Sequence, residues 1–109
     1  MSGWQDLREA LLKFREERDW AQFHNAKDLA LALSIEAAEL NELFLWKNAD
    51  DANPERIKEE LADVIAYAIL LAEKYDLDIN EIVLDKIEQN NRKYPVEKSK
   101  GTAKKYNEL

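Results

Sequence analysis

Two pairs of acidic residues recur at the same spacing in this sequence. Glu36 and Glu39 form the first pair, and Glu60 and Asp63 form the second. Residues three apart on a helix lie on one surface, so each pair would place two carboxylates side by side. A carboxylate in an apolar environment must be neutralised, paired or bound to a metal ion. The two pairs therefore predict four carboxylates facing one another around a metal site.

Apolar helical stripes surround the leading carboxylate of each pair. On a helical wheel, Glu36 falls among the leucines of one stripe, and Glu60 falls inside a second stripe. The stripes consist of Leu29, Leu33, Leu40 and Leu43, and of Ile57, Val64, Tyr67 and Leu71. Glutamates three apart are also common on solvated helix faces, so an ordinary surface role for the quartet stays open as the alternative.

The ligand type narrows the choice of ion. Carboxylate oxygens without Cys or His favour a hard cation such as Mg²⁺ or Mn²⁺. A ferritin-like di-iron centre would need Glu-x-x-His on two helices. The single histidine, His24, lies outside both acidic pairs, so di-iron is not expected. A divalent cation on such carboxylates can bridge them to phosphates and activate a water for in-line attack.

Four helices are expected to position these residues. We expect them over residues 4–18, from the N-cap Asn25 to about Lys47, from Pro54 to about Tyr75, and from Asp78 or Asn80 to Tyr94. Two glycines and two prolines leave few places for turns, and no strand alternation is present. The sequence thus predicts one all-α domain over residues 1–109, a four-helix bundle with a basic tail from about residue 95.

Composition limits the classes of partner. The formal net charge of −7 disfavours binding to a nucleic acid polymer, whereas a small phosphorylated ligand is possible when cations mediate. The longest uncharged apolar run, Val64 to Ala72, is well short of the roughly 20 residues that span a membrane. The start of the chain lacks a signal-peptide pattern, and there is no cysteine. We therefore expect a cytoplasmic protein that binds neither membrane nor polynucleotide.

Aromatic residues stand near both acidic pairs. Tyr67 is four residues beyond Asp63, and Trp46 is seven beyond Glu39, so each would lie on the ligand face beyond its acidic pair. Such rings could stack on a nucleotide base, although plain core packing explains them equally well. Trp20 and Phe23 are assigned to packing.

Several segments together resemble a known family. RDWAQFH, NAKDLALALSIEAAELNELFLWK, EELADVIAY, KIEQNNRKYPV and KGTAKKY occur in this order. From about Arg18 to the C-terminus, the chain resembles the all-α MazG-like nucleoside triphosphate pyrophosphohydrolases, with most similarity to their dCTP pyrophosphatase branch. The resemblance implies Mg²⁺ on Glu36, Glu39, Glu60 and Asp63, and hydrolysis of a deoxynucleoside triphosphate, dCTP preferred, to monophosphate and pyrophosphate.

The resemblance also implies roles for seven other residues. His24, Trp46 and Tyr67 would contact the base and sugar, and a second group would face the phosphates or the deoxyribose. That group consists of Lys86, Asn90, Lys93 and Tyr94. For His24 a structural capping role is the alternative.

An oligomer is expected, because carboxylates within the apolar stripes leave so short a chain with little core. We expect a homotetramer, a dimer of dimers, with a dimer as the alternative.

Two functional alternatives remain. The same fold could act on another nucleotide such as dUTP, dATP or phosphoribosyl-ATP, or the chain could be a non-enzymatic acidic helical interaction module, which would show neither turnover nor stabilisation by divalent cations.

Overall fold

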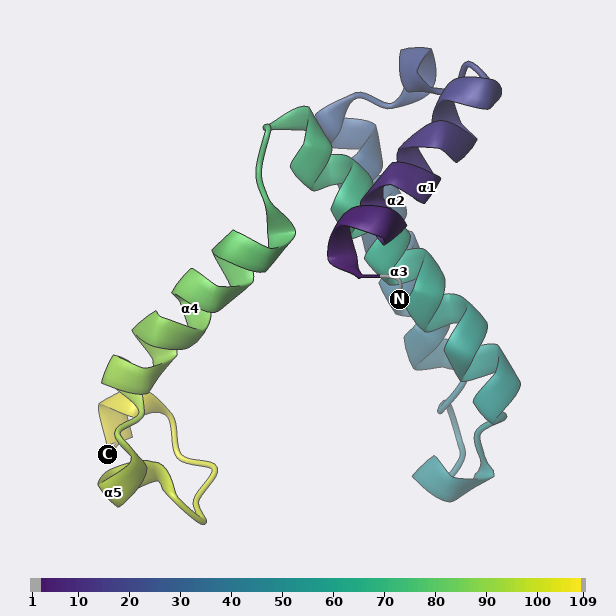
Figure 1. Cartoon of the computed structure of the whole chain (residues 1–109). Coiled ribbons are helices and arrows are strands. Elements are labelled where there is room, and N and C mark those ends of the chain that lie inside the picture. Colours follow the sequence, from purple (N-terminus) through teal and green to yellow (C-terminus); the bar gives the residue numbers. More distant parts are fainter. Residues whose placement is uncertain (1–2, 109) are drawn as a thin grey trace. The chain divides into compact units, whose positions relative to one another are not determined.

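The computed structural model describes residues 3–108, and all the regular elements among them are helical (Figure 1). The α-helices are α1 (Trp4–Glu17), α2 (Ala26–Glu42), α3 (Pro54–Lys74), α4 (Ile79–Lys93) and α5 (Val96–Ser99). Short 3₁₀ turns lie at Ala21–Phe23, Ala49–Asp51 and Tyr106–Glu108. The all-α prediction is confirmed. The prediction of four helices is wrong by one, because the chain resumes a single helical turn directly after Pro95.

The chain divides into two compact units, one ending at Asp76 and the other beginning at Leu77. The first unit contains α1, α2 and α3, and the second contains α4 and α5. Each unit is described by itself below. A single bundle domain over residues 1–109 stays a prediction.

Side-chain caps set the starts of the three long helices that follow α1. The Oδ1 atom of Asn25 accepts a hydrogen bond from the Asp28 amide at 2.9 Å, and Asn53 caps α3 in the same way with Pro54 at the first helical position. Of the two candidates for α4, the cap is Asp78, which accepts from the Glu81 amide at 3.0 Å. These starts follow the sequence prediction.

The end of α2 differs from the prediction. The helix stops at Glu42 and not near Lys47, because the amides of the next three residues bond to carbonyls three residues back, at 3.1–3.2 Å. Trp46 then takes a positive φ of 62°, which is uncommon for a bulky side chain. The helical spacing that placed Trp46 over Glu39 therefore does not hold.

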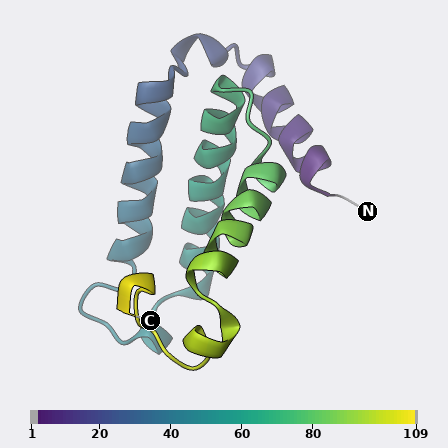
Figure 2. The same cartoon turned by 90° about the vertical axis from the view of Figure 1, so that its left-hand side faces the viewer.

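The core of the first unit lies where α2 packs against α3 (Figure 2). Leu29 on α2 is 1% exposed, and Ile69 and Leu70 on α3 are also buried. The predicted stripes face this contact, because their members are buried or half-buried along both helices. The helix α1 packs on α3 more loosely and is tied to it by an ion pair between Arg8 and Glu73.

A second apolar stripe on each of these helices is exposed. Leu31 and Ile35 lie one turn apart on α2, and Leu61 and Ile65 lie one turn apart on α3; all four are about half exposed. The core is small compared with this exposed apolar surface, because only five hydrophobic residues among those described are buried. The first unit by itself thus leaves much apolar surface in contact with water.

In the second unit the chain turns back on α4. After α5, Tyr106 packs edge-on against Tyr94 with ring centroids 6.3 Å apart, and the Nζ atom of Lys93 lies 5.1 Å from the Tyr106 ring centroid. The predicted basic tail is therefore attached at its end by aromatic and cation–π contacts. No helix within residues 3–108 has the length and apolar character needed to cross a membrane.

Replacing Leu29 by alanine should destabilise the fold, because its side chain is the most fully buried in the α2–α3 contact. We expect the free energy of unfolding to fall by about 2–5 kcal/mol in urea denaturation. Lys27→Ala, an exposed change on the same helix, is the control. Equal unfolding curves for Leu29→Ala and the parent would contradict this core.

Candidate functional site

The packing of α2 on α3 brings three of the predicted carboxylates together. Glu36 comes from α2, and Glu60 and Asp63 come from α3; one carboxylate oxygen of each lies within 4.8 Å of the others. The Oε2 atoms of Glu36 and Glu60 are buried and have no hydrogen-bond partner among residues 3–108. Buried oxygens of this kind are costly unless something binds them.

The electrostatics of this acidic cluster centre on Glu36. Burial, followed by the proximity of the Glu39, Glu60 and Asp63 carboxyl groups, raises the pKa of Glu36 to about 7. An acid in this environment holds its proton unless a positive charge takes the proton's place. Three convergent carboxylates with two unpartnered oxygens fit a hard divalent cation.

Glu39 occupies a different position from the other three. Like Asp63 it is exposed, but it is not part of the group whose oxygens lie within 4.8 Å of one another. Its carboxyl group contributes to the raised pKa of Glu36, after the larger effect of burial. The structure therefore brings three predicted residues around one point and places the fourth beside Glu36.

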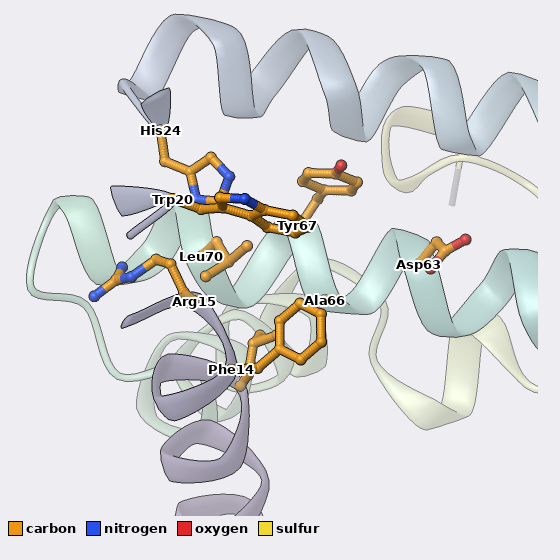
Figure 3. A pocket seen from close by; sticks show the side chains of 9 residues that line it. Phe14, Arg15, Trp20, His24, Asp63, Ala66, Tyr67 and Leu70 are labelled. Atoms are coloured by element: carbon orange, nitrogen blue, oxygen red, sulfur yellow. The ribbon is translucent and has the colours of Figure 1, made fainter. Parts of the chain in front are cut away.

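A cavity of about 330 Å³ adjoins the acidic cluster through Asp63 (Figure 3). Its walls come from α1, α3 and the connection between α1 and α2, and most of them are apolar or aromatic. They are formed by Leu11, Phe14, Arg15, Trp20, His24, Asp63, Ala66, Tyr67 and Leu70. A concave apolar site of this volume with a few polar groups is typical of a small-molecule site.

Trp20 reaches the cavity because of the way α1 ends. Asp19 takes a positive φ of 53°, the Asp19 amide bonds to the Glu16 carbonyl, and the Trp20 amide bonds to the Arg15 carbonyl, both at 3.1 Å. These bonds form a Schellman motif, in which the second residue beyond the cap packs back on the helix. The Trp20 ring accordingly lies edge-on to Phe14, with centroids 5.6 Å apart.

The assignment of Trp20 to packing alone was therefore incomplete. The ring contacts Phe14, as packing requires, and it also lines the cavity together with His24 and Tyr67 (Figure 3). The signal in the sequence was Asp19 directly after the last periodic residue of α1, since Asp tolerates the left-handed conformation that turns the chain. Arg15, also in the cavity wall, carried no signal beyond being one charge among several on an amphipathic helix.

His24 is an uncharged polar group in the cavity wall. Burial, followed by the charges of Arg15 and Lys74, lowers the pKa of His24 below its usual value of 6.5. Its Nδ1 atom is buried without a hydrogen-bond partner in the described part of the chain. A neutral imidazole with an unpartnered nitrogen can form a directed hydrogen bond to a ligand.

The other predicted contact residues lie elsewhere. Trp46 follows the C-terminal end of α2 and is 95% exposed. His24 precedes the N-terminal end of the same helix, whose 17 residues span roughly 25 Å. Trp46 therefore does not line the cavity that contains His24. The remaining predicted contacts belong to the second unit and are exposed there: Lys86, Asn90, Lys93 and Tyr94.

A family model described as MazG-like matches residues 31–109, which include both acidic pairs. The chain belongs to the MazG-like family. Among the relatives of this MazG-like chain, dCTP pyrophosphatase 1 of Bos taurus is 40% identical, over 96% of this chain and 67% of the bovine protein. The human protein of the same name is 38% identical, over 96% of this chain and 66% of its own length. The chain thus spans about two thirds of these mammalian relatives.

A solved structure agrees with the same family membership. The crystal structure of a pyrophosphatase from Archaeoglobus fulgidus matches this MazG-like chain with a TM-score of 0.77 and 37% identity. The match covers 84% of this chain and 91% of the archaeal one. The resemblance found in the sequence is confirmed.

The acidic cluster predicts a pH-dependent response to Mg²⁺. Without a cation, stability should fall as pH rises from 4.5 to about 7, because the unfolded chain releases the Glu36 proton first. Mg²⁺ needs the ionised form, so its stabilising effect should grow as pH rises through about 7. Thermal melts with millimolar Mg²⁺ and with EDTA should therefore differ more at about pH 8 than at about pH 6.

Glu36→Gln tests the assignment of that response. The variant should lose both the Mg²⁺-induced shift and its pH dependence while staying folded. A shift of the melting temperature that is the same at both pH values, or that survives the substitution, would contradict the site.

Proposed function

We propose that this chain is a Mg²⁺-dependent pyrophosphohydrolase that converts a deoxynucleoside triphosphate, dCTP first among them, to the monophosphate and pyrophosphate. Membership of the MazG-like family, together with relatives named dCTP pyrophosphatase 1 and pyrophosphatase, makes the chain an enzyme of the nucleoside triphosphate pyrophosphohydrolase class. The choice of ion, the substrate and the roles of single residues are the proposal.

One observation carries it: the carboxylates of Glu36, Glu60 and Asp63 converge directly beside an aromatic cavity. Asp63 belongs to both, so a ligand could reach from the cluster into the cavity. A deoxynucleoside triphosphate has a matching shape, with a charged end and an aromatic end. The arrangement supports a triphosphate at the carboxylates and a base between the rings of Trp20 and Tyr67.

The roles of the acidic residues follow from their placement. Glu36, Glu60 and Asp63 would hold the cation, with Glu39 beside Glu36 as a fourth carboxylate within reach of bound water. Mn²⁺ could replace Mg²⁺, since both prefer oxygen ligands. Mg²⁺ held there would neutralise charge on the triphosphate and activate the water that attacks the α-phosphorus.

The cavity residues would orient the nucleoside. Trp20 and Tyr67 present aromatic faces, on which a base stacks for about 1–3 kcal/mol whichever base it is. His24 offers a neutral ring nitrogen for a hydrogen bond. For Lys86, Asn90, Lys93 and Tyr94 we propose contacts with the phosphates or the deoxyribose; Lys93 and Tyr94 are held beside Tyr106.

We further propose that the enzyme is a homotetramer, with a dimer as the alternative. The second apolar stripes of α2 and α3, represented by Leu31 and Leu61, supply surface that a further copy would bury. Trp46 supports the same proposal. Its positive φ and nearly full exposure present the ring to something other than the cavity of its own unit, and the site of another copy is the simplest recipient.

Product analysis tests the reaction. Incubation of the chain with Mg²⁺ and a panel of nucleotides (dCTP, dTTP, dUTP, dATP and phosphoribosyl-ATP) should release pyrophosphate, fastest from dCTP with dCMP as the second product. Chromatography separates the products. Orthophosphate with dCDP would overturn the cleavage position. No turnover of any nucleotide would favour an acidic interaction module.

Glu36→Gln and Asp63→Asn should each abolish turnover of dCTP while the helical circular dichroism stays unchanged. Each substitution keeps the shape of the side chain and removes the charge that a cation requires. Glu88→Gln, an exposed change outside the first unit, is the control and should keep parental activity. A Glu36→Gln or Asp63→Asn enzyme with parental kcat would remove that residue from the proposed set.

A further inference from the structure

Arg15 is a cation at the end of the cavity opposite to the acidic cluster. Figure 3 shows Asp63 on one side of the cavity, and Arg15, Trp20 and His24 together on the other. Only 12% of the Arg15 side chain is exposed. A guanidinium this well buried in a cavity wall is uncommon unless its donors are used.

Glu16, the partner of Arg15, uses only some of the N–H donors of the guanidinium. The Nε and Nη2 atoms both donate to Oε1 of the adjacent Glu16, at 3.0 and 2.5 Å. The Glu16 side chain is 60% exposed, so the carboxylate of this ion pair faces water and not the cavity. No hydrogen bond from Nη1 is found within residues 3–108. The guanidinium is thus oriented by Glu16 and retains donors for another group.

We infer that Arg15 determines the base preference of the site by donating hydrogen bonds to the acceptor edge of a cytosine. The inference rests on the proposed function, which puts the triphosphate at the carboxylates and hence the base at the Arg15 end. Stacking on Trp20 and Tyr67 accepts any base. Discrimination has to come from polar groups, and Arg15 and His24 are the polar side chains at this end.

The chemistry of the guanidinium selects among pyrimidines. Arginine has N–H donors and no acceptor. Cytosine presents two adjacent acceptors, the ring N3 and the O2 oxygen, which suit a donor fork. Uracil and thymine carry a hydrogen on N3, so an N–H of Arg15 would face another N–H. A buried donor left without an acceptor rejects the wrong ligand more strongly than a change in shape does.

The state of His24 supports this arrangement. Burial, followed by the charge of Arg15, lowers the pKa of His24, so the imidazole is neutral at pH 7 and has one acceptor nitrogen. Cytosine also carries an exocyclic amino group that donates. Arg15 as the donor and His24 as the acceptor therefore match cytosine, which has both acceptors and a donor on one edge.

A pair of matched substitutions tests the inference. Arg15→Gln removes the guanidinium, and Arg18→Gln makes the same change three residues away, where the side chain lies over the Phe14 ring and does not line the cavity. With Mg²⁺, Arg15→Gln should raise the KM for dCTP by about tenfold or more and lower the ratio of kcat/KM for dCTP to that for dUTP by a similar factor. The kcat for dCTP should change much less.

Further measurements separate specificity from structure. Arg18→Gln should keep the parental ratio, and Arg15→Lys should restore part of it, because lysine donates without the planar fork. Quenching of tryptophan fluorescence by dCMP measures binding without turnover and should weaken in Arg15→Gln alone. An unchanged ratio, or equal losses for dCTP and dUTP, would overturn the inference. Absence of turnover in the parent protein would instead refute the proposed function, and that assay comes first.

Discussion

Repulsion among the carboxylates at the α2–α3 contact is the constraint on which the rest of the structure depends. Glu36, Glu60 and Asp63 stand where a chain of this size could have placed leucines. Two of their oxygens are buried without partners in the described part of the chain, and the pKa of Glu36 is raised to about 7. The fold accepts this cost at its most extensive helix contact, on the same two helices that carry the buried Leu29 and Leu70. A cation is the simplest way to turn the repulsion into attraction.

The helices that create this contact were predictable from the sequence, because the carboxylates sit inside regular apolar stripes and capping residues mark the helix starts. Glu36 and Glu60 were therefore placed correctly on the inner faces of α2 and α3. The end of α2 was not predictable in the same way. Leu43 to Lys47 continues an apolar pattern, and only the backbone shows that the helix stops at Glu42 and that Trp46 takes a left-handed conformation. In this segment the apolar periodicity continues beyond the point where the helix ends.

The cavity was still less accessible to sequence reasoning, because it depends on a turn and on a contact between distant segments. Trp20 lines it as a result of two backbone hydrogen bonds around Asp19, and Arg15 lines it because α1 lies against α3. Neither residue has a spacing that relates it to the acidic pairs. The residues of the second unit, such as Lys93 and Tyr94, had a local organisation that the sequence did not indicate, since their contact with Tyr106 joins positions more than ten residues apart.

The two parts of the candidate site are built by different structural elements. The acidic cluster depends on the packing of two long helices, because Glu36 comes from α2 and Glu60 and Asp63 come from α3. The opposite end of the cavity depends on the last turn of α1 and the short connection after it, where α1 packs only loosely on α3. In the proposed function, hydrolysis takes place between the two long helices, and the base is selected at the C-terminal end of α1.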